Sequence, residues 1–258
     1  MKLEIDRLRM EYGVGTKSPV LALPETSFGV RENEFVSLLG VSGCGKSTLL
    51  SLVAGLRPAT SGRIMLDGAE VLGPGVDRGV VFQAYTLLPW LTARQNIEFA
   101  VAEASPKVKN RDRIARELLG TVGLADFADA YPSQLSGGMR QRVAIARVLA
   151  YKPEVMLMDE PFGALDALTR SLMQELLMQV WEEHKLTVLF VTHDISEAVF
   201  LSDRVIVMSK DRENFLTEVE IDLPRPRTPE VTDSVRFHEL TSDLVMRLRD
   251  EARQASHL

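Results

Sequence analysis

The stretch GVSGCGKS at residues 40–47 constrains the fold of this chain more than any other feature. It follows the apolar run FVSLL at residues 35–39 and opens a helical pattern at residues 46–54. A glycine-containing loop between a strand and a helix can curl so that successive backbone N–H groups point inward at phosphate oxygens. The positive end of the helix dipole adds to that attraction. The stretch therefore predicts a phosphate-binding loop within an α/β domain.

Short apolar runs alternate with helical patterns along the rest of the chain, which is typical of an α/β fold with a largely parallel sheet. Further strands are expected at residues 63–66, 79–82, 155–158, 187–191 and 205–208. The pattern is mainly helical from about residue 92 to 150, and helices are also expected at about 166–184 and 234–254. The runs at 155–158 and 187–191 with the helix between them form a βαβ unit.

Composition narrows the possible partners. The formal net charge is −6, and acidic and basic residues are interspersed. Nucleic-acid-binding proteins usually carry a basic patch or stripe, so no nucleic-acid partner is expected. No window approaches about eighteen uncharged apolar residues, so no segment is expected to span a bilayer. The first twelve residues have no apolar core, which argues against a secretory signal. If the protein acts at a membrane, it is expected to be held there by a partner protein.

Two carboxylates end the apolar run EVMLMDE at residues 154–160. Asp159 ends a strand at the edge where open α/β sheets bind ligands, and it can hold Mg²⁺ through water. Glu160 can polarise an attacking water as a general base. In the phosphate loop, Lys46 supplies charge for the β- and γ-phosphates and the Ser47 hydroxyl can ligate Mg²⁺. The alternative for Asp159 and Glu160 alone is a pair of solvated acids at an ordinary strand end.

A second candidate anion site is the stretch LSGGMRQ at residues 135–141. Ser136 and the two glycines after it expose backbone N–H groups immediately before an amphipathic helix. A simple helix N-cap is the alternative interpretation of the same residues. Two phosphate sites on one chain pose a geometric problem, because serving one nucleotide in cis would require the helical insert to fold back over the first loop.

Taken together, GVSGCGKS, LSGGMRQR and MDEPFGALD resemble the ATP-binding cassette (ABC) family, in that family's order and spacing over essentially the whole chain. The resemblance implies an α/β P-loop ATPase core with an N-terminal antiparallel β arm and an inserted α-helical subdomain. Residues 1–232 would form the ATP-binding domain, with the insert at about 92–150, and residues 233–258 a C-terminal helical tail. It also implies that two subunits pair head to tail, so that each ATP lies between one P-loop and the partner's LSGG.

The resemblance assigns further roles one residue at a time. Tyr12 resembles the aromatic residue that stacks on adenine, and Gln83 the glutamine that links Mg²⁺ to the membrane partner. Asp166 resembles the aspartate of the cross-dimer contact loop, and His193 the switch histidine that contacts the γ-phosphate. The alternatives are a surface aromatic for Tyr12, a solvated polar residue for Gln83, a helix cap for Asp166 and a structural histidine for His193.

The implied cofactors are ATP and Mg²⁺, and the implied activity is ATP hydrolysis coupled to transport. The catalytic set is Glu160, His193 and Lys46, and the metal ligands are Ser47, Gln83 and Asp159. The expected ATP contacts are Tyr12, Gly40, Val41, Ser42, Gly43, Cys44, Gly45, Lys46, Ser47 and Thr48 in cis, with Ser136, Gly137, Gly138 and Gln141 in trans. Val41 departs from the small residue or proline that is commoner at its position.

Four stretches, at residues 73–83, 87–97, 192–205 and 222–227, resemble importers of nitrate, sulfonates, taurine or bicarbonate. This implies a peripheral subunit on the cytoplasmic side of the inner (plasma) membrane, held there by a multi-span permease. A second ATP-binding subunit, in a homodimer, and indirectly an external solute-binding protein complete the assembly. The competing hypotheses are an ABC-type ATPase that serves as an assembly scaffold and a P-loop small-molecule kinase, which leaves LSGGMRQR unexplained.

The cluster LLPW at residues 87–90 follows Gln83 closely. Because tryptophan buries a large area at interfaces, Leu88 and Trp90 are expected to line the groove that receives a cytoplasmic helix of the permease. Gln83 would transmit the nucleotide state to that groove. The alternative is that Trp90 packs into the helical insert.

Overall fold

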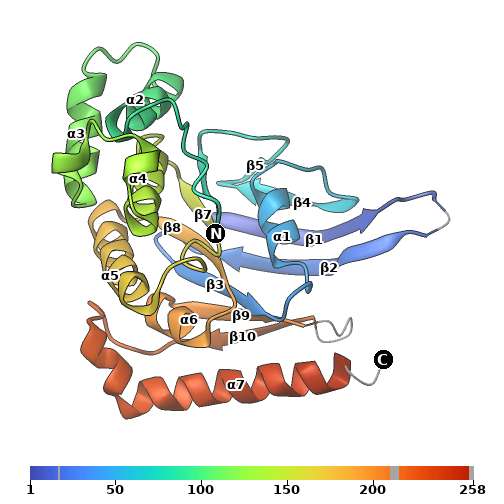
Figure 1. The fold of residues 1–258 in the computed structure, drawn as a ribbon. Coiled ribbons are helices and arrows are strands. Elements are labelled where there is room, and N and C mark those ends of the chain that lie inside the picture. The colour runs from blue at the N-terminus through green and yellow to red at the C-terminus, as the bar shows by residue number, and fades with distance from the viewer. Residues whose placement is uncertain (17, 210–214, 256–258) are drawn as a thin grey trace. The chain divides into compact units, whose positions relative to one another are not determined.

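The computed structural model describes residues 1–16, 18–209 and 215–255, with side chains up to residue 249. The chain divides into two compact units, one formed by Met1–Pro74 and Leu186–Leu258 and the other by Gly75–Lys185. Each unit combines strands with helices (Figure 1).

The first unit contains an antiparallel sheet with the strand order β2-β1-β4-β5. Its strands are β1 (Leu3–Tyr12), β2 (Val20–Val30), β4 (Ser61–Leu66) and β5 (Ala69–Glu70). The two long strands, β1 and β2, pair from Leu3 opposite Val30 to Tyr12 opposite Val20 and form the arm that extends from the unit in Figure 1. Buried and exposed side chains alternate along parts of β1, so one face of the arm is covered.

In the same unit, β10 (Leu216–Glu220), β9 (Arg204–Met208), β3 (Phe35–Gly40) and β8 (Thr187–Thr192) lie side by side in that order. Strand β3 is parallel to both β8 and β9, and β10 is antiparallel to β9. Every residue of β3, β8 and β9 is buried, which explains their nearly unbroken apolar sequences. The helices are α1 (Lys46–Val53), α6 (Ile195–Leu201) and α7 (Val235–Ala255), with a 3₁₀ turn at Pro229–Asp233, and α7 packs against α6.

Arg227, from the stretch DLPRPR, closes the C-terminal end of α6. Its buried guanidinium donates hydrogen bonds to the carbonyl oxygens of Val199, Phe200 and Ser202, at 3.1, 3.0 and 2.6 Å. Burial lowers the pKa of Arg227 to about 10, because desolvation disfavours the charged form. The side chain thereby satisfies carbonyl groups that a helix end leaves without partners.

The second unit contains a parallel pair of strands, β6 (Arg78–Val81) and β7 (Val155–Asp159), and four α-helices among the residues described. These are α2 (Ala93–Ala104), α3 (Arg111–Thr121), α4 (Gly137–Leu149) and α5 (Ala167–His184), with 3₁₀ turns at Ala125–Phe127 and Pro132–Gln134. Helices α2, α3 and α4 share one apolar core, to which Ile97, Leu119 and Val143 contribute completely buried side chains. The capping box of Thr92 and Gln95 starts α2.

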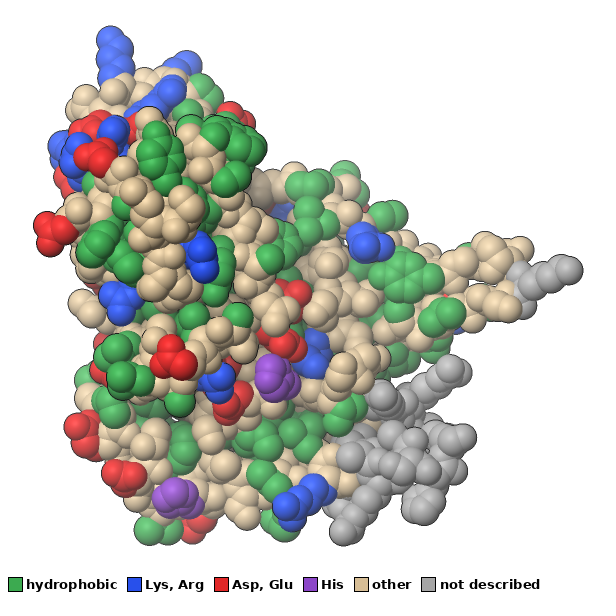
Figure 2. Space-filling view, in the orientation of Figure 1, with side chains coloured by type: hydrophobic (Ala, Val, Ile, Leu, Met, Phe, Trp, Pro, Cys, Tyr) green, Lys and Arg blue, Asp and Glu red, His purple; other side chains and the backbone are tan. Residues whose placement is uncertain are grey.

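This architecture confirms the predicted fold class, an α/β core with an antiparallel β arm. The strands predicted from apolar runs correspond to β3, β4, β6, β7, β8 and β9. Short elements, namely β5, α6 and β10, were not predicted. Acidic and basic side chains are interspersed on the face shown in Figure 2. Among the described residues, no helix is both long enough and apolar enough to cross a membrane.

Candidate functional site

Two glycines of the loop between β3 and α1 pack closely against the backbone of other segments. A Cβ atom at Gly40 would lie 2.4 Å from the carbonyl oxygen of Met208, and one at Gly45 would lie 2.6 Å from that of Ala22. Gly45 also has φ +104°, which a residue with a side chain adopts only under strain. A Cβ at Gly43 would meet nothing within 4 Å, so the crest of the loop is open.

Lys46 folds back over this loop. Its ammonium donates hydrogen bonds to the carbonyl oxygens of Gly40, at 2.7 Å, and Val41, at 3.2 Å. Cys44 is buried, with its Sγ 4.0 Å from the same Nζ atom. Ser42, Gly43 and Ser47 are exposed, while Thr48 is half-buried. A buried lysine bonded to the backbone of a loop whose crest is open is suited to bind the phosphates of a nucleotide.

His193 lies at the same sheet edge as the loop. In the parallel pairing of β3 and β8, Leu39 is opposite Thr192, so Gly40 and His193 both follow at the carboxyl ends of neighbouring strands. His193 is exposed. The turn after it is fixed by Thr192, whose hydroxyl donates to the buried carboxylate of Glu197 and accepts from the backbone N–H of Asp194. Glu197 is a positioning group that sequence analysis did not identify.

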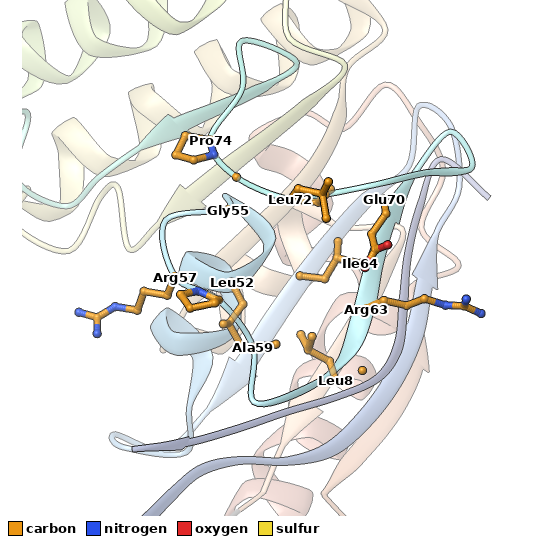
Figure 3. Close-up of a pocket in the computed structure, with 14 residues that line it drawn as sticks. Leu8, Leu52, Gly55, Arg57, Ala59, Arg63, Ile64, Glu70, Leu72 and Pro74 are labelled. Carbon is orange, nitrogen blue, oxygen red and sulfur yellow. The ribbon is translucent and has the colours of Figure 1, made fainter. Parts of the chain in front are cut away.

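Tyr12 lies at the end of β1 and is half-buried. The guanidinium carbon of Arg57 lies 5.7 Å from the centroid of its ring, within the range of a cation–π interaction. Arg57 also lines a cavity of about 360 Å³ in the first unit, between Leu52, Ile64 and Leu72 (Figure 3). No predicted site residue lines this cavity.

The second unit carries the two carboxylates and Gln83. In the parallel pairing of β6 and β7, Val81 is opposite Met158, so Gln83 and Glu160 follow at the same sheet edge. A Cβ atom at Gly163 would lie 3.4 Å from Gln83 Nε2 and 3.9 Å from Glu160 Oε2, so both side chains border this glycine. Gln83 is exposed, and Asp159 is half-buried. Amide and carboxylate oxygens are suitable ligands for Mg²⁺.

Glu160 has an unusual backbone conformation, with φ +44°. Few residues other than glycine occupy this left-handed region, and such strain gathers at functional sites. The carbonyl oxygen of Glu160 accepts a hydrogen bond of 3.1 Å from the N–H of Gly163. The turn after β7 is thereby closed, with its half-buried carboxylate held beside Gly163.

Ser136 is the N-cap of α4, since its hydroxyl accepts a hydrogen bond of 3.2 Å from the N–H of Met139. Ser136 is exposed, Gly137 is half-buried and Gly138 is buried. The simple capping interpretation therefore holds, and it leaves the exposed start of the helix available to an anion. Gln141, one turn further along α4, is completely buried, and neither polar atom of its amide has a hydrogen-bond partner among the described residues.

Asp166 is the N-cap of α5. Its carboxylate accepts hydrogen bonds from the backbone N–H of Thr169, at 3.0 Å, and from the Thr169 hydroxyl, at 2.7 Å. These bonds favour the ionised form and hold the pKa of Asp166 below its ordinary value. The cap is exposed, so the alternative in which Asp166 caps a helix holds, and its role in the contact between subunits stays a prediction.

Trp90 is 68% exposed, so the alternative in which it packs into the helical insert is wrong. The neighbouring backbone is rigid because the buried side chain of Asn96 accepts from the N–H of Leu88 and donates to the carbonyl oxygens of Leu88 and Leu91. Leu88 itself is half-buried. The tryptophan therefore projects from a firmly held turn.

Known proteins resemble this chain over most of its length. It is 50% identical to an uncharacterized ABC transporter ATP-binding protein of Methanocaldococcus jannaschii, over 97% of this chain and 92% of the relative. It is 46% identical to the nitrate import ATP-binding protein NrtD of Synechocystis, over 96% of both chains. It is also 45% identical to the bicarbonate transport ATP-binding protein CmpC of Synechococcus elongatus, over 96% of this chain and 38% of CmpC.

The fold of the chain is also similar to that of a solved structure. The ATP-binding cassette MJ0796, in a dimeric post-hydrolysis state bound to ADP and Pi, matches with a TM-score of 0.76 and 33% identity, over 86% of this chain and 100% of that one. Residues 23–163 match the ABC transporter family itself. None of the relatives named here is described as a scaffold. The chain therefore belongs to the ABC transporter family, as one of its ATP-binding, ATP-hydrolysing cassettes.

Proposed function

We propose that this chain is the ATPase subunit that energises a membrane importer of a small anion such as nitrate, bicarbonate, a sulfonate or taurine. The observation that carries the proposal is the near-full-length similarity to NrtD, which is named for nitrate import. The similarity to CmpC, named for bicarbonate transport, supports the same class of solute. The chain would be a peripheral subunit on the cytoplasmic face of the membrane, held there by a multi-span permease and served by an external solute-binding protein.

In this proposal, different residues bind the nucleotide and activate the attacking water. Lys46 and the loop from Gly40 to Thr48 bind the phosphates, with Tyr12 stacked on the adenine. Glu160 polarises the attacking water, and His193 contacts the γ-phosphate. Ser47, Gln83 and Asp159 would hold Mg²⁺, which when bound neutralises charge on the phosphate oxygens.

The trans contacts require a second subunit, and we propose a homodimer. Ser136, Gly137 and Gly138 would face the nucleotide of the partner subunit, with Asp166 near the contact between subunits. The dimeric structure of the similar cassette MJ0796 supports this arrangement. Gln141, predicted as a further contact in trans, would support the LSGG stretch from within the second unit, because its side chain is completely buried. Residues 1–232 would be the ATP-binding domain and residues 233–258 its helical tail.

Trp90→Ala tests the membrane contact. A tryptophan that is 68% exposed on a rigid turn is suited to fill a pocket in a partner, so its truncation should weaken assembly with the permease by about 2 kcal/mol or more. ATP binding by the isolated subunit should not change, since Trp90 lies outside the phosphate loop. Recovery of the intact complex and uptake of solute are the measurements.

Phe127→Ala is the matched control for Trp90→Ala. It truncates another aromatic side chain of the second unit, which is 44% exposed and is not part of residues 87–90. The control should assemble and transport as the wild type does. Normal assembly of Trp90→Ala would contradict the proposed role of Trp90 in permease coupling.

A further inference from the structure

Thr86, three residues after Gln83, has a backbone conformation that needs support. Its φ of +46° lies in the left-handed region, where a β-branched residue is a genuine outlier. Such a conformation persists only when the surrounding structure holds it. Residues 83–86, which we name the Gln83 segment, are therefore kept in place by contacts outside the segment itself.

Arg147 of α4 supplies the strongest of these contacts. Its Nη1 donates a hydrogen bond of 2.7 Å to the carbonyl oxygen of Thr86, and its Nη2 donates one of 2.8 Å to the Thr86 hydroxyl. The planar fork of a guanidinium makes two such bonds at once, which a lysine ammonium on a flexible stem does not reproduce. Burial lowers the pKa of Arg147 by desolvation. The side chain itself is half-buried, and both of its Nη atoms bond to Thr86.

Arg140 makes a second contact two helical turns earlier on the same face of α4. Its guanidinium carbon lies 5.2 Å from the centroid of the Tyr85 ring, in a cation–π arrangement. The hydroxyl of that ring also reaches the first residue of the helix, since a Cβ atom at Gly137 would lie 3.0 Å from Tyr85 Oη. Tyr85 and Thr86 are thus held along α4 from its LSGG end to its last turn.

We propose that Arg147, assisted by Arg140, is a positioning residue for ATP hydrolysis. Arg147 holds Thr86 and Arg140 holds Tyr85, and together they fix the Gln83 segment. The Gln83 amide is thereby kept beside Gly163 and Glu160. Helix α4 begins at the LSGG stretch, so the same contacts connect the start of α4 to Gln83. The inference rests on the role proposed above for Gln83.

The test compares steady-state ATP hydrolysis by full-length variants. Arg147→Ala should lower kcat about tenfold, as expected from the loss of charge-assisted hydrogen bonds, with little change in KM for ATP. Arg147→Lys should recover only part of the loss. The control is Arg113→Ala, which removes an exposed arginine of α3 that pairs with Glu117 and should leave both constants unchanged.

A rescue separates positioning from a general loss of structure. Asparagine tolerates the left-handed region better than a β-branched residue, so Thr86→Asn in the Arg147→Ala background should restore part of kcat. Thr86→Val keeps Arg147 and the shape of residue 86 but removes the hydroxyl acceptor. Thr86→Val replaces Arg147→Ala as the test variant if Arg147→Ala does not fold. It should lower kcat and speed amide hydrogen exchange at residues 83–87.

Gln83→Ala, measured in parallel, distinguishes two kinds of failure. If Gln83→Ala hydrolyses ATP at the wild-type rate, the proposed role of Gln83 is wrong and the positioning role falls with it. If Gln83→Ala loses activity while Arg147→Ala and Thr86→Val match Arg113→Ala, the positioning role alone is overturned. A loss of activity in Arg147→Ala that Thr86→Asn does not relieve would also overturn it.

Discussion

Glu160→Gln should stop ATP hydrolysis while leaving ATP binding intact. Glutamine has nearly the same shape as glutamate but cannot accept the proton of the attacking water, and the loss of a general base typically slows a reaction by about 10²- to 10⁴-fold. Lys46 and the phosphate loop are unchanged, so nucleotide affinity should be preserved. With ATP bound and not consumed, the variant should accumulate as a closed dimer. Phosphate release and light scattering in Mg²⁺–ATP measure the two effects.

The matched control for Glu160→Gln is Glu154→Gln, which makes the same change at an exposed carboxylate just before β7. It should hydrolyse ATP at the wild-type rate and should not accumulate as a dimer. Hydrolysis by Glu160→Gln at close to the wild-type rate would show that another group is the base.

Lys46→Ala should act at the earlier step, on nucleotide binding itself. The ammonium now bonded to the carbonyl oxygens of Gly40 and Val41 is the cation proposed to meet the β- and γ-phosphates. Removing a charge-assisted contact of this kind should weaken ATP affinity by roughly 10- to 100-fold. Titration with a fluorescent ATP analogue measures the change.

Lys107→Ala is the control for Lys46→Ala, since it removes an exposed lysine before α3, outside the phosphate loop. It should bind ATP as the wild type does. Thermal unfolding without nucleotide would show whether Lys46→Ala disturbs the loop, because Lys46 also bonds to the backbone of that loop. Unchanged ATP affinity in a folded Lys46→Ala variant would refute the role of Lys46.

The parts of the fold that could be predicted are those in which the local sequence decides the structure. The strands β3, β7 and β8, which are buried except for Asp159 at the end of β7, come from largely apolar runs, and the loop after β3 carries its glycines at fixed spacing. Asp166 could be predicted as a helix cap because an N-cap depends on a residue and the N–H groups of the next turn. The order of the motifs then indicated the family.

The remaining features depend on residues that are distant in the sequence. The positive φ angle of Thr86 is stabilised by a tertiary contact with Arg147, and no local propensity favours the positive φ angles of Thr86 and Glu160. The pairing of Arg147 with Thr86 joins positions 61 residues apart. Helix α6 is only seven residues long, too short for a clear helical period. The burial of Gln141 likewise follows from the packing of α4 and not from its place in the LSGG stretch.

The most direct test of the central claim is to isolate the tagged full-length chain from native membranes in mild detergent and measure ATP hydrolysis by what co-purifies. The proposed function predicts a complex with a multi-span membrane protein whose ATPase activity is lost when the chain carries Glu160→Gln. Recovery of the chain only with soluble partners, or a membrane complex whose ATPase activity does not change with Glu160→Gln, would contradict it.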